Sequence, residues 1–437
     1  MKKIVLLIVI AIGVKMLAAQ TWQQSFPDPL LQNYITEAME NNADLRTAQL
    51  SLEQSAAMLK QARLSYLPAF SLAPSGTVSK AQNEAANYTY ELPLTMSWEL
   101  SFGGKRHHQK KMALAELEKD SAQLEYAQIQ LIAEVANAYY TLVMLDRQYA
   151  ITQEGILVQE ENLRVLRAMK EVGRQNEAAV SQAEASYQGV LATSPMLEAQ
   201  IQKAETVLCL LLNRDPLPNS QLSTLNSQLI KRASWEEVKG IVMDTDRAIP
   251  LEALASRPDM LAAECLLRAS FSNVKVARSE FYPTLSISGS AGWTNNGVTI
   301  NPNQILLNAI SSLTQPLFAQ GRLKANLKVA QSQQEQTQIA FEKALLVAGG
   351  EVRDALADCR ACSTREEART KQVKAAQRAY ENSRLTMQYA NTSYLEVLIA
   401  QSAWLDAQLQ QTADWLEKQQ SRINLFKATC GGIELLW

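Results

Sequence analysis

The side chains best suited to chemistry are two cysteines three residues apart and two adjacent histidines. Cys359 and Cys362 have the spacing of a redox pair or of two thiolate ligands to a metal. His107 and His108 have no Cys or carboxylate partner at ligand spacing. We find no nucleophile motif, phosphate-binding loop or zinc signature in the sequence. These patterns disfavour an enzyme and predict no bound cofactor or metal.

An internal repeat explains the cysteines better. Residues 44–72 match residues 259–287 at one constant offset, and matches continue further along the chain with only a two-residue drift. In this repeat Cys359 and Cys362 align with Leu142 and Leu145, which lie on a helical seam of apolar residues spaced by three and four. The repeat therefore favours buried cysteines that act as small hydrophobic side chains.

Each copy is expected to contain a helix, a strand pair and a very long helical hairpin. An N-terminal secretory signal precedes the first copy, although an N-terminal membrane anchor remains an alternative. The expected segments are a signal peptide at 1–19, a first repeat at 20–213 (strand pair 66–102, hairpin 104–213), an equatorial linker at 214–250, a second repeat at 251–430 (strand pair 282–318, hairpin 321–430) and a tail at 431–437.

The strands give the most informative pattern. Residues 88–102 alternate without a break between apolar and polar side chains, which predicts a strand with one apolar face and one polar face. The segment exceeds the roughly 9–11 residues that a tilted strand needs to cross a bilayer. A soluble sheet packed on a core remains an alternative. Aromatic residues near the strand ends are typical of interfacial girdles, and the candidates are Tyr88, Trp98, Phe102 and Trp293.

The helices are predicted to be unusually long. No proline occurs between Pro93 and Pro195, and residues 105–167 are rich in good helix formers. Such a helix would extend roughly 90–100 Å at 1.5 Å per residue, so it must pack against similar helices. The net charge of -2 and the pI near 6.0 give no global basic field for nucleic acid.

Several motifs together carry a family resemblance. Residues 257–259 (Arg-Pro-Asp), 281–285 (Phe-Tyr-Pro-Thr-Leu), 313–318 (Leu-Thr-Gln-Pro-Leu-Phe) and 391–398 (Asn-Thr-Ser-Tyr-Leu-Glu-Val-Leu) are similar to those of TolC-like outer-membrane efflux channels. The resemblance covers about residues 28–430. It implies an α+β membrane protein and a homotrimer. In that trimer four strands per protomer close a twelve-stranded β-barrel, which a periplasmic α-helical coiled-coil barrel continues.

The same resemblance implies a function and its partners. The protein would be a passive exit duct for small molecules in the outer membrane, in contact with its lipid, with a large periplasmic extension. A periplasmic adaptor would dock on the helical tips, and an inner-membrane pump, of the proton-driven RND type, would supply the energy. The resemblance places adaptor docking at the tip turns, with candidates Gly173, Asn391 and Ser393.

The family's gate lies at the same helical tip. Glu396 matches an acidic position that narrows the pore, whereas Ile399 stands where a second acid can occur. Ala179 and Thr392 stand where some relatives carry a charged lock. We therefore expect one acidic ring together with apolar closure, and the gate candidates are Glu396, Ile399, Leu395 and Thr392.

Plainer interpretations remain beside these. Glu396 could be an ordinary solvated residue, Gly173 a simple helix break, and the basic run at 105–111 a solvated helix start rather than a lipid or substrate contact. A periplasmic adaptor, the main rival, would show one hairpin between glycine-rich β modules. A structural coiled coil is disfavoured by the alternating strand at 88–102.

Overall fold

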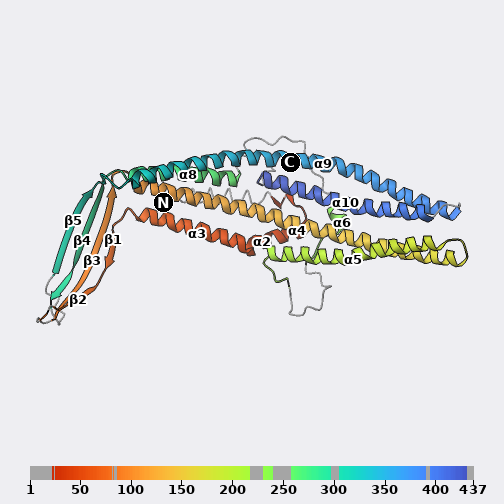
Figure 1. Cartoon of the computed structure of the whole chain (residues 1–437), viewed down its shortest axis with the longest axis horizontal. Helices are drawn as coiled ribbons and strands as arrows, with labels where there is room; N and C mark the ends of the chain where they lie inside the picture. Colours follow the sequence, from red (N-terminus) through yellow and green to blue (C-terminus); the bar gives the residue numbers. More distant parts are fainter. Residues whose placement is uncertain are drawn as a thin grey trace. The chain divides into compact units, whose positions relative to one another are not determined.

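The computed structural model describes residues 22–23, 25–80, 82, 86–216, 230–239, 257–296, 305–389 and 394–430. Thr392, Asn391, Ser393 and the predicted signal and tail lie outside the described residues. The elements are α2 (Pro29–Asn41), α3 (Ala43–Leu64), β1 (Ala69–Leu72), β2 (Ser75–Ser79), β3 (Asn87–Ser101), α4 (Lys105–Glu171), α5 (Glu177–Leu211), α6 (Trp235–Val238), α8 (Pro258–Ser279), β4 (Thr284–Asn296), β5 (Ile305–Thr314), α9 (Arg322–Tyr389) and α10 (Tyr394–Ala428) (Figure 1).

The described residues divide into two compact units. Unit 1 comprises those of Met1–Thr47, Glu125–Arg257 and Leu346–Trp437, and unit 2 comprises those of Ala48–Leu124 and Pro258–Leu345. The expected order of helix, strand pair and long hairpin occurs twice along the chain. The two longest helices, α4 and α9, have 67 and 68 residues, which confirms the prediction of very long helices.

Unit 2 contains one antiparallel sheet with the order β1–β3–β4–β5, and β2 also pairs with β3 (Figure 1). The strand predicted from the alternation at 88–102 is confirmed as β3. The first strand of the sheet is divided into β1 and β2 at residues 73–74, because Pro74 has no N–H to donate to a ladder. The last strand was expected to reach Phe318 but ends at Thr314, since Pro316 follows.

Strand register extends the apolar face of β3 over the whole sheet. Directly paired residues of antiparallel strands share a face, and Leu92 pairs with Trp293 while Trp98 pairs with Ile287. Trp293 in turn pairs with Ile305 of β5. The large side chains of this face are solvent-exposed in the single chain, and they include Phe70, Leu72, Val78, Tyr90, Leu92, Leu94, Trp293, Ile305, Leu307 and Leu313.

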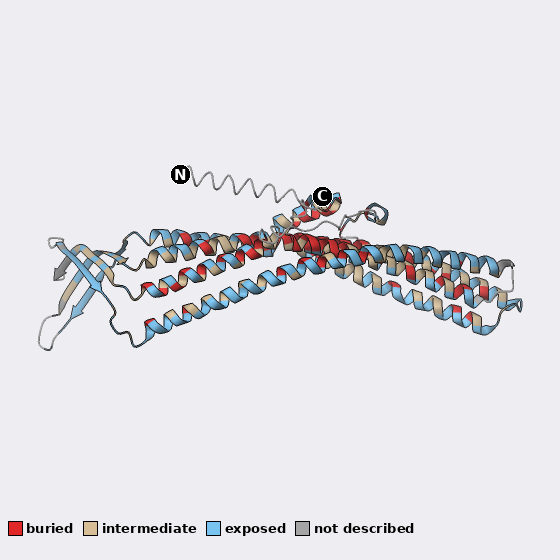
Figure 2. Cartoon of the chain, turned by 90° about the horizontal axis from the view of Figure 1, so that it is seen from above, coloured by how far each residue is buried: buried red, intermediate tan, exposed pale blue. Residues whose placement is uncertain are grey.

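The core of unit 1 follows the seam of α4. Leu131, Val135 and Leu142 are buried, as their spacing predicts, and buried residues are dense in this part of the helices (Figure 2). Cys359 and Cys362 in α9 are also buried, each with 3% of its surface exposed, which confirms their expected place in the packing. Burial raises the pKa of the Cys359 thiol to about 11, so the thiolate is disfavoured.

Buried polar side chains tie the segments of unit 1 together. The Asp28 carboxylate accepts hydrogen bonds from the backbone N–H of Leu30 and from the Tyr139 hydroxyl, at 2.8 and 2.6 Å. The same hydroxyl accepts a hydrogen bond from the Ala233 N–H at 3.0 Å. Residue 28 thus caps α2 and joins it to α4, and Tyr139 joins α4 to the segment before α6.

Two arginine side chains of unit 1 are almost completely buried. The guanidinium of Arg232 contacts Asp146 at 2.5 Å and Glu205 at 2.6 Å. Arg257, with 1% of its surface exposed, contacts Glu351 at 2.6 Å and donates to the carbonyl oxygen of Ala428 at 3.0 Å. The two arginines therefore fix the segments at 230–239 and at 257 against the helices of unit 1.

Candidate functional site

The turn between α4 and α5 is closed by its own backbone. Gly173 has a φ of +71°. Its N–H donates to the carbonyl oxygen of Lys170, and the N–H of Arg174 donates to the carbonyl oxygen of Met169, each at 2.9 Å. These two bonds form a Schellman motif, which requires a left-handed residue at the position of Gly173. The Asn176 side chain accepts from the Ala179 N–H at 2.9 Å and caps α5. Gly173 is therefore needed for the turn itself, and its predicted role in docking stays a prediction.

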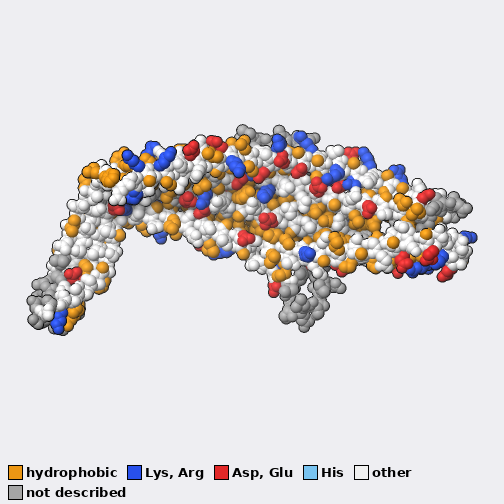
Figure 3. All heavy atoms as spheres, in the orientation of Figure 1, with side chains coloured by type: hydrophobic (Ala, Val, Ile, Leu, Met, Phe, Trp, Pro, Cys, Tyr) orange, Lys and Arg blue, Asp and Glu red, His pale blue; other side chains and the backbone are white. Residues whose placement is uncertain are grey.

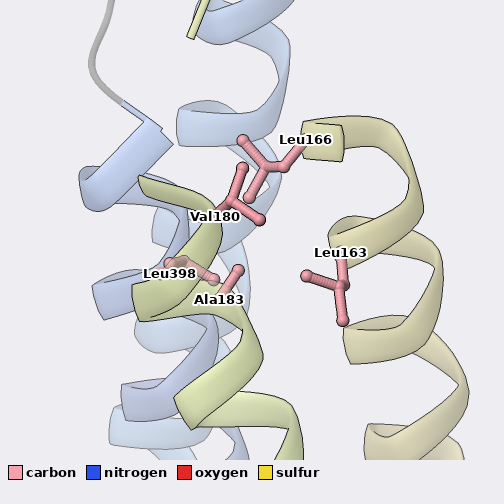
Figure 4. Packing of buried hydrophobic residues seen from close by; sticks show 5 residues of the cluster. All are labelled: Leu163, Leu166, Val180, Ala183 and Leu398. Carbon is pink, nitrogen blue, oxygen red and sulfur yellow. The ribbon is translucent and has the colours of Figure 1, made fainter. Parts of the chain in front are cut away.

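A small apolar cluster holds the tip of unit 1. Leu163 and Leu166 from α4 point toward Val180 and Ala183 of α5 and toward Leu398 of α10 (Figure 4). Burying one leucine side chain is worth about 1.5–3 kcal/mol relative to exposure. Since residues from both repeats meet in this cluster, the two helical hairpins are coupled directly at their tips.

Polar contacts extend this coupling along the hairpins. The Asn162 amide of α4 donates to Gln401 of α10 at 2.7 Å. The Gln159 amide, also on α4, donates to the Ser186 hydroxyl of α5 at 3.2 Å. The first of these bonds joins the two hairpins and the second holds the first hairpin together, so a displacement of one hairpin relative to the other would break the Asn162–Gln401 hydrogen bond as well as apolar packing.

Three of the four predicted gate residues share an exposed face of α10. Leu395, Glu396 and Ile399 are exposed, with fractions of 52% for Leu395 and 60% for Ile399, whereas Val397 and Leu398 are buried. Glu396 stands in the first turn of the helix. Among the described residues it has no basic partner within 4 Å. The exposed stripe is available to another surface, and its place at a gate stays a prediction.

The predicted girdle residues lie near the ends of the sheet strands. Tyr88 and Trp98 are half-buried in β3, while Phe102 is 66% and Trp293 48% exposed. The indole N–H of Trp98 donates to the carbonyl oxygen of Tyr66 at 2.9 Å. The acidic side chains of Glu91 and Glu99 project from the opposite, polar face, as the alternation predicts.

The histidines and cysteines are the remaining side chains with potential for chemistry. The described side chains include no cluster of three or more His, Cys, Asp or Glu arranged to hold a metal. Burial and then the charges of His107, Lys275 and Lys111 lower the pKa of His108, which favours its neutral form. No helix among the described residues is both long enough and apolar enough to span a bilayer.

Sequence reasoning missed the polar ties of unit 1. Tyr139 was not singled out from the sequence, and its hydroxyl contact with Asp28 joins residues 111 positions apart. Arg257 was noticed only through its motif. A charged residue directly before a proline-started helix was the available signal for its buried role.

A sheet with an exposed apolar face, together with two long helical hairpins in the same chain, defines the class of outer-membrane channels with a helical extension. The family model described as "Outer membrane efflux protein" matches residues 34–214 and 249–431. The chain belongs to this family. It is an outer-membrane channel of the efflux type with a periplasmic helical extension, and it is not an enzyme.

Named relatives agree with this assignment. The chain is 28% identical over 431 residues to the toluene efflux pump outer membrane protein TtgC of Pseudomonas putida, covering 95% of this chain and 86% of the relative. It is 27% identical to the cation efflux system protein CusC of Escherichia coli, covering 94% and 88%. The solved MtrE outer membrane channel of Neisseria gonorrhoeae matches with a TM-score of 0.78 and 25% identity, over 93% of this chain and 90% of that one.

Proposed function

We propose that three copies of the chain form one duct through the outer membrane. The observation that carries this proposal is the sheet, whose outer strands β1 and β5 are both free edges in the described chain. Exposed, long, apolar edges must be paired or covered. Strand directions alternate from β1 to β5, so β5 of one copy meets β1 of the next in antiparallel orientation. Three four-stranded sheets then close into twelve strands, with the apolar face toward lipid.

The tip of unit 1 is proposed as the gate of this duct. Around a threefold axis the exposed stripe of α10 would bring three copies of Leu395, Glu396 and Ile399 near each other. Three carboxylates in a narrow pore attract cations and repel anions. The apolar cluster beneath the stripe holds each hairpin pair in one position, so opening requires the pairs to move as units.

The same tip is proposed as the docking site of a periplasmic adaptor that links the duct to an inner-membrane pump. The tight turn at Gly173 is the described surface at the end of the first hairpin. Asn391 and Ser393, which lie outside the described residues, are the predicted docking positions of the second hairpin. The named relatives belong to systems for toluene and for cations. Because such cargoes share no chemistry, we propose that the pump selects the substrate and that the duct conducts small molecules passively.

Replacing Glu396 with Gln tests the gate, because it removes the charge and keeps the size of the side chain. The purified protein is reconstituted in planar bilayers, and conductance and cation-to-anion permeability are measured. We expect the wild type to prefer cations and the Glu396→Gln variant to lose most of that preference, since the negative field at the constriction disappears. Glu53→Gln, an exposed glutamate of α3, is the matched control and should behave as the wild type.

The outcomes separate two sources of closure. Unchanged selectivity in Glu396→Gln would reject the acidic ring. In that case larger conductance in Leu395→Ala or Ile399→Ala would assign the constriction to the apolar residues of the stripe. If the wild type and all of these variants form trimers but none of them conducts, the result would contradict a gate at the tip.

A further inference from the structure

The four helix ends next to the sheet are strongly basic. In the eight residues of α3, α4, α8 and α9 nearest the sheet there are eleven Lys and Arg residues and no Asp or Glu, although the whole chain has 42 basic and 44 acidic residues. We name this set the basic collar. Its members are Lys60, Arg63, Lys105, Arg106, Lys110, Lys111, Lys275, Arg278, Arg322, Lys324 and Lys328.

The collar is mostly exposed and largely unpaired. Figure 3 shows Lys and Arg side chains gathered where the helices meet the sheet. Nine of the eleven residues are exposed, and the exceptions are Lys105 and Arg106. Lys105 pairs with Glu280 at 3.2 Å, and no other member has a carboxylate within 4 Å among the described residues. The positive charges are therefore left for a partner outside the chain.

Helix electrostatics does not account for the collar. Lysine and arginine are favourable at the C-terminal ends of α3 and α8 but unfavourable at the N-terminal ends of α4 and α9, where the helix dipole is positive. Neither α4 nor α9 has an acidic residue in its first turn. The charges of Lys111 and Lys275 both act on His108, so α4 and α8 bring their basic residues together. An external anion would offset this local repulsion.

An apolar belt lies between the collar and the sheet. The short links from helices to strands expose large side chains, among them Tyr66, Leu67, Phe102, Tyr282, Leu317 and Phe318, of which Leu317 and Phe318 are 93% and 86% exposed. Aromatic and aliphatic residues at this level, followed immediately by lysine and arginine, match the polarity profile of a membrane interface. The C-terminal end of α4 and the beginning of α5 carry ion pairs instead, such as Arg167 with Glu184 at 3.4 Å.

We propose that the basic collar binds the phosphate groups of anionic phospholipids in the periplasmic leaflet of the outer membrane. The inference rests on the outer-membrane location of the sheet and is independent of the gate at the tip. The apolar belt sets the depth of the sheet in the bilayer, and the collar binds headgroups at the boundary where the periplasmic helices begin. Anionic lipid would thereby fix the height and tilt of the duct.

A charge-removal variant tests the collar. Lys110, Lys111, Lys324 and Lys328 are exposed, lack ion pairs and belong to two helices, so all four are changed to Gln in one variant. Detergent-solubilised protein is incubated with equal amounts of phosphatidylglycerol and phosphatidylethanolamine, and retained lipids are counted by native mass spectrometry. We expect the wild type to retain mainly phosphatidylglycerol and the variant to lose that preference about tenfold, given the attraction of each lysine to an anionic surface.

A second variant of equal charge provides the control. Lys203, Arg360, Lys374 and Arg384 are exposed and lie far along the chain from the sheet, and their combined change to Gln should preserve the preference. Equal retention of both lipids by the wild type, or equal loss of preference in both variants, would overturn the proposal. Displacement of the lipid by millimolar inorganic phosphate would also overturn it, because the collar would then be a site for free phosphate. Unchanged oligomer mobility shows that both variants are folded.

Discussion

Gly292→Ala is expected to prevent assembly of the sheet in the outer membrane. A Cβ atom at this position would lie 2.3 Å from the carbonyl oxygen of Leu92 and 2.7 Å from the Cα of Pro93. Both neighbours are backbone atoms of β3, so the strands must separate to admit a single methyl group. Overpacking of this kind costs about 3 kcal/mol, at the upper end of the usual range. The close approach occurs opposite Pro93, where the register pairs the only residue of β3 that cannot donate a hydrogen bond with a glycine.

The amount of protein in the outer-membrane fraction and its resistance to dissociation in mild detergent measure this effect. Gly289→Ala is the matched control, because it adds the same methyl group three residues earlier in β4. There the nearest atom is the carbonyl oxygen of Asn308 at 3.4 Å, so the stability should change by less than about 1 kcal/mol. Normal levels of the Gly292→Ala protein would show that β3 and β4 can separate without loss of the fold.

The sheet and the long helices were predictable because their information is local. Period-two alternation over 88–102 indicates a strand and both of its faces, and a proline-free run of good helix formers indicates α4. The repeat added the alignment of Cys359 with a buried leucine, which no local pattern supplies. The strand bounds differ from the prediction at two places, and a proline lies at each. The first strand is divided after Leu72, and β5 ends at Thr314, because proline lacks the N–H that a strand donates to its neighbour.

The polar ties of unit 1 were not predictable because their partners are far apart in sequence. Tyr139 reads as one more apolar residue until its hydroxyl is placed beside Asp28. Arg232 lies in a segment that shows neither alternation nor a helical period, so nothing in the sequence separates it from a surface arginine. For the gate, residues 395–399 are known by type from the sequence. Whether they line a pore depends on how several copies are arranged around a symmetry axis, which one chain does not specify.

Arg232→Met is expected to destabilise unit 1 by about 3–5 kcal/mol, the usual cost of leaving one side of a buried ion pair without its partner. The Arg232 side chain is 5% exposed and lies between Asp146 and Glu205, whose side chains are 35% and 7% exposed. Methionine fills much of the volume but leaves the two carboxylates with mutual repulsion and lost hydrogen bonds. Thermal unfolding followed by circular dichroism at 222 nm measures the loss, since unit 1 is mainly helical.

An exposed pair provides the control for this variant. Arg214 contacts both oxygens of Glu37, at 2.5 and 2.6 Å, but its side chain is 41% exposed. Its change to Met should cost no more than about 1 kcal/mol, because water replaces the lost partner and screens the charge. Similar losses in the two variants would contradict the special role of the buried pair.

The Arg232→Met loss should also depend on pH in a defined direction. Burial raises the pKa of Asp146 above its ordinary value even with Arg232 beside it, and removing the guanidinium raises that pKa further. A carboxyl whose pKa is higher in the folded state penalises folding when it is ionised, and the penalty disappears as pH falls through the folded pKa. The variant should therefore lie closer in stability to the wild type at pH 5 than at pH 8. A gap that is constant or widens toward acid would indicate that lost packing, rather than unpaired charge, destabilises the variant.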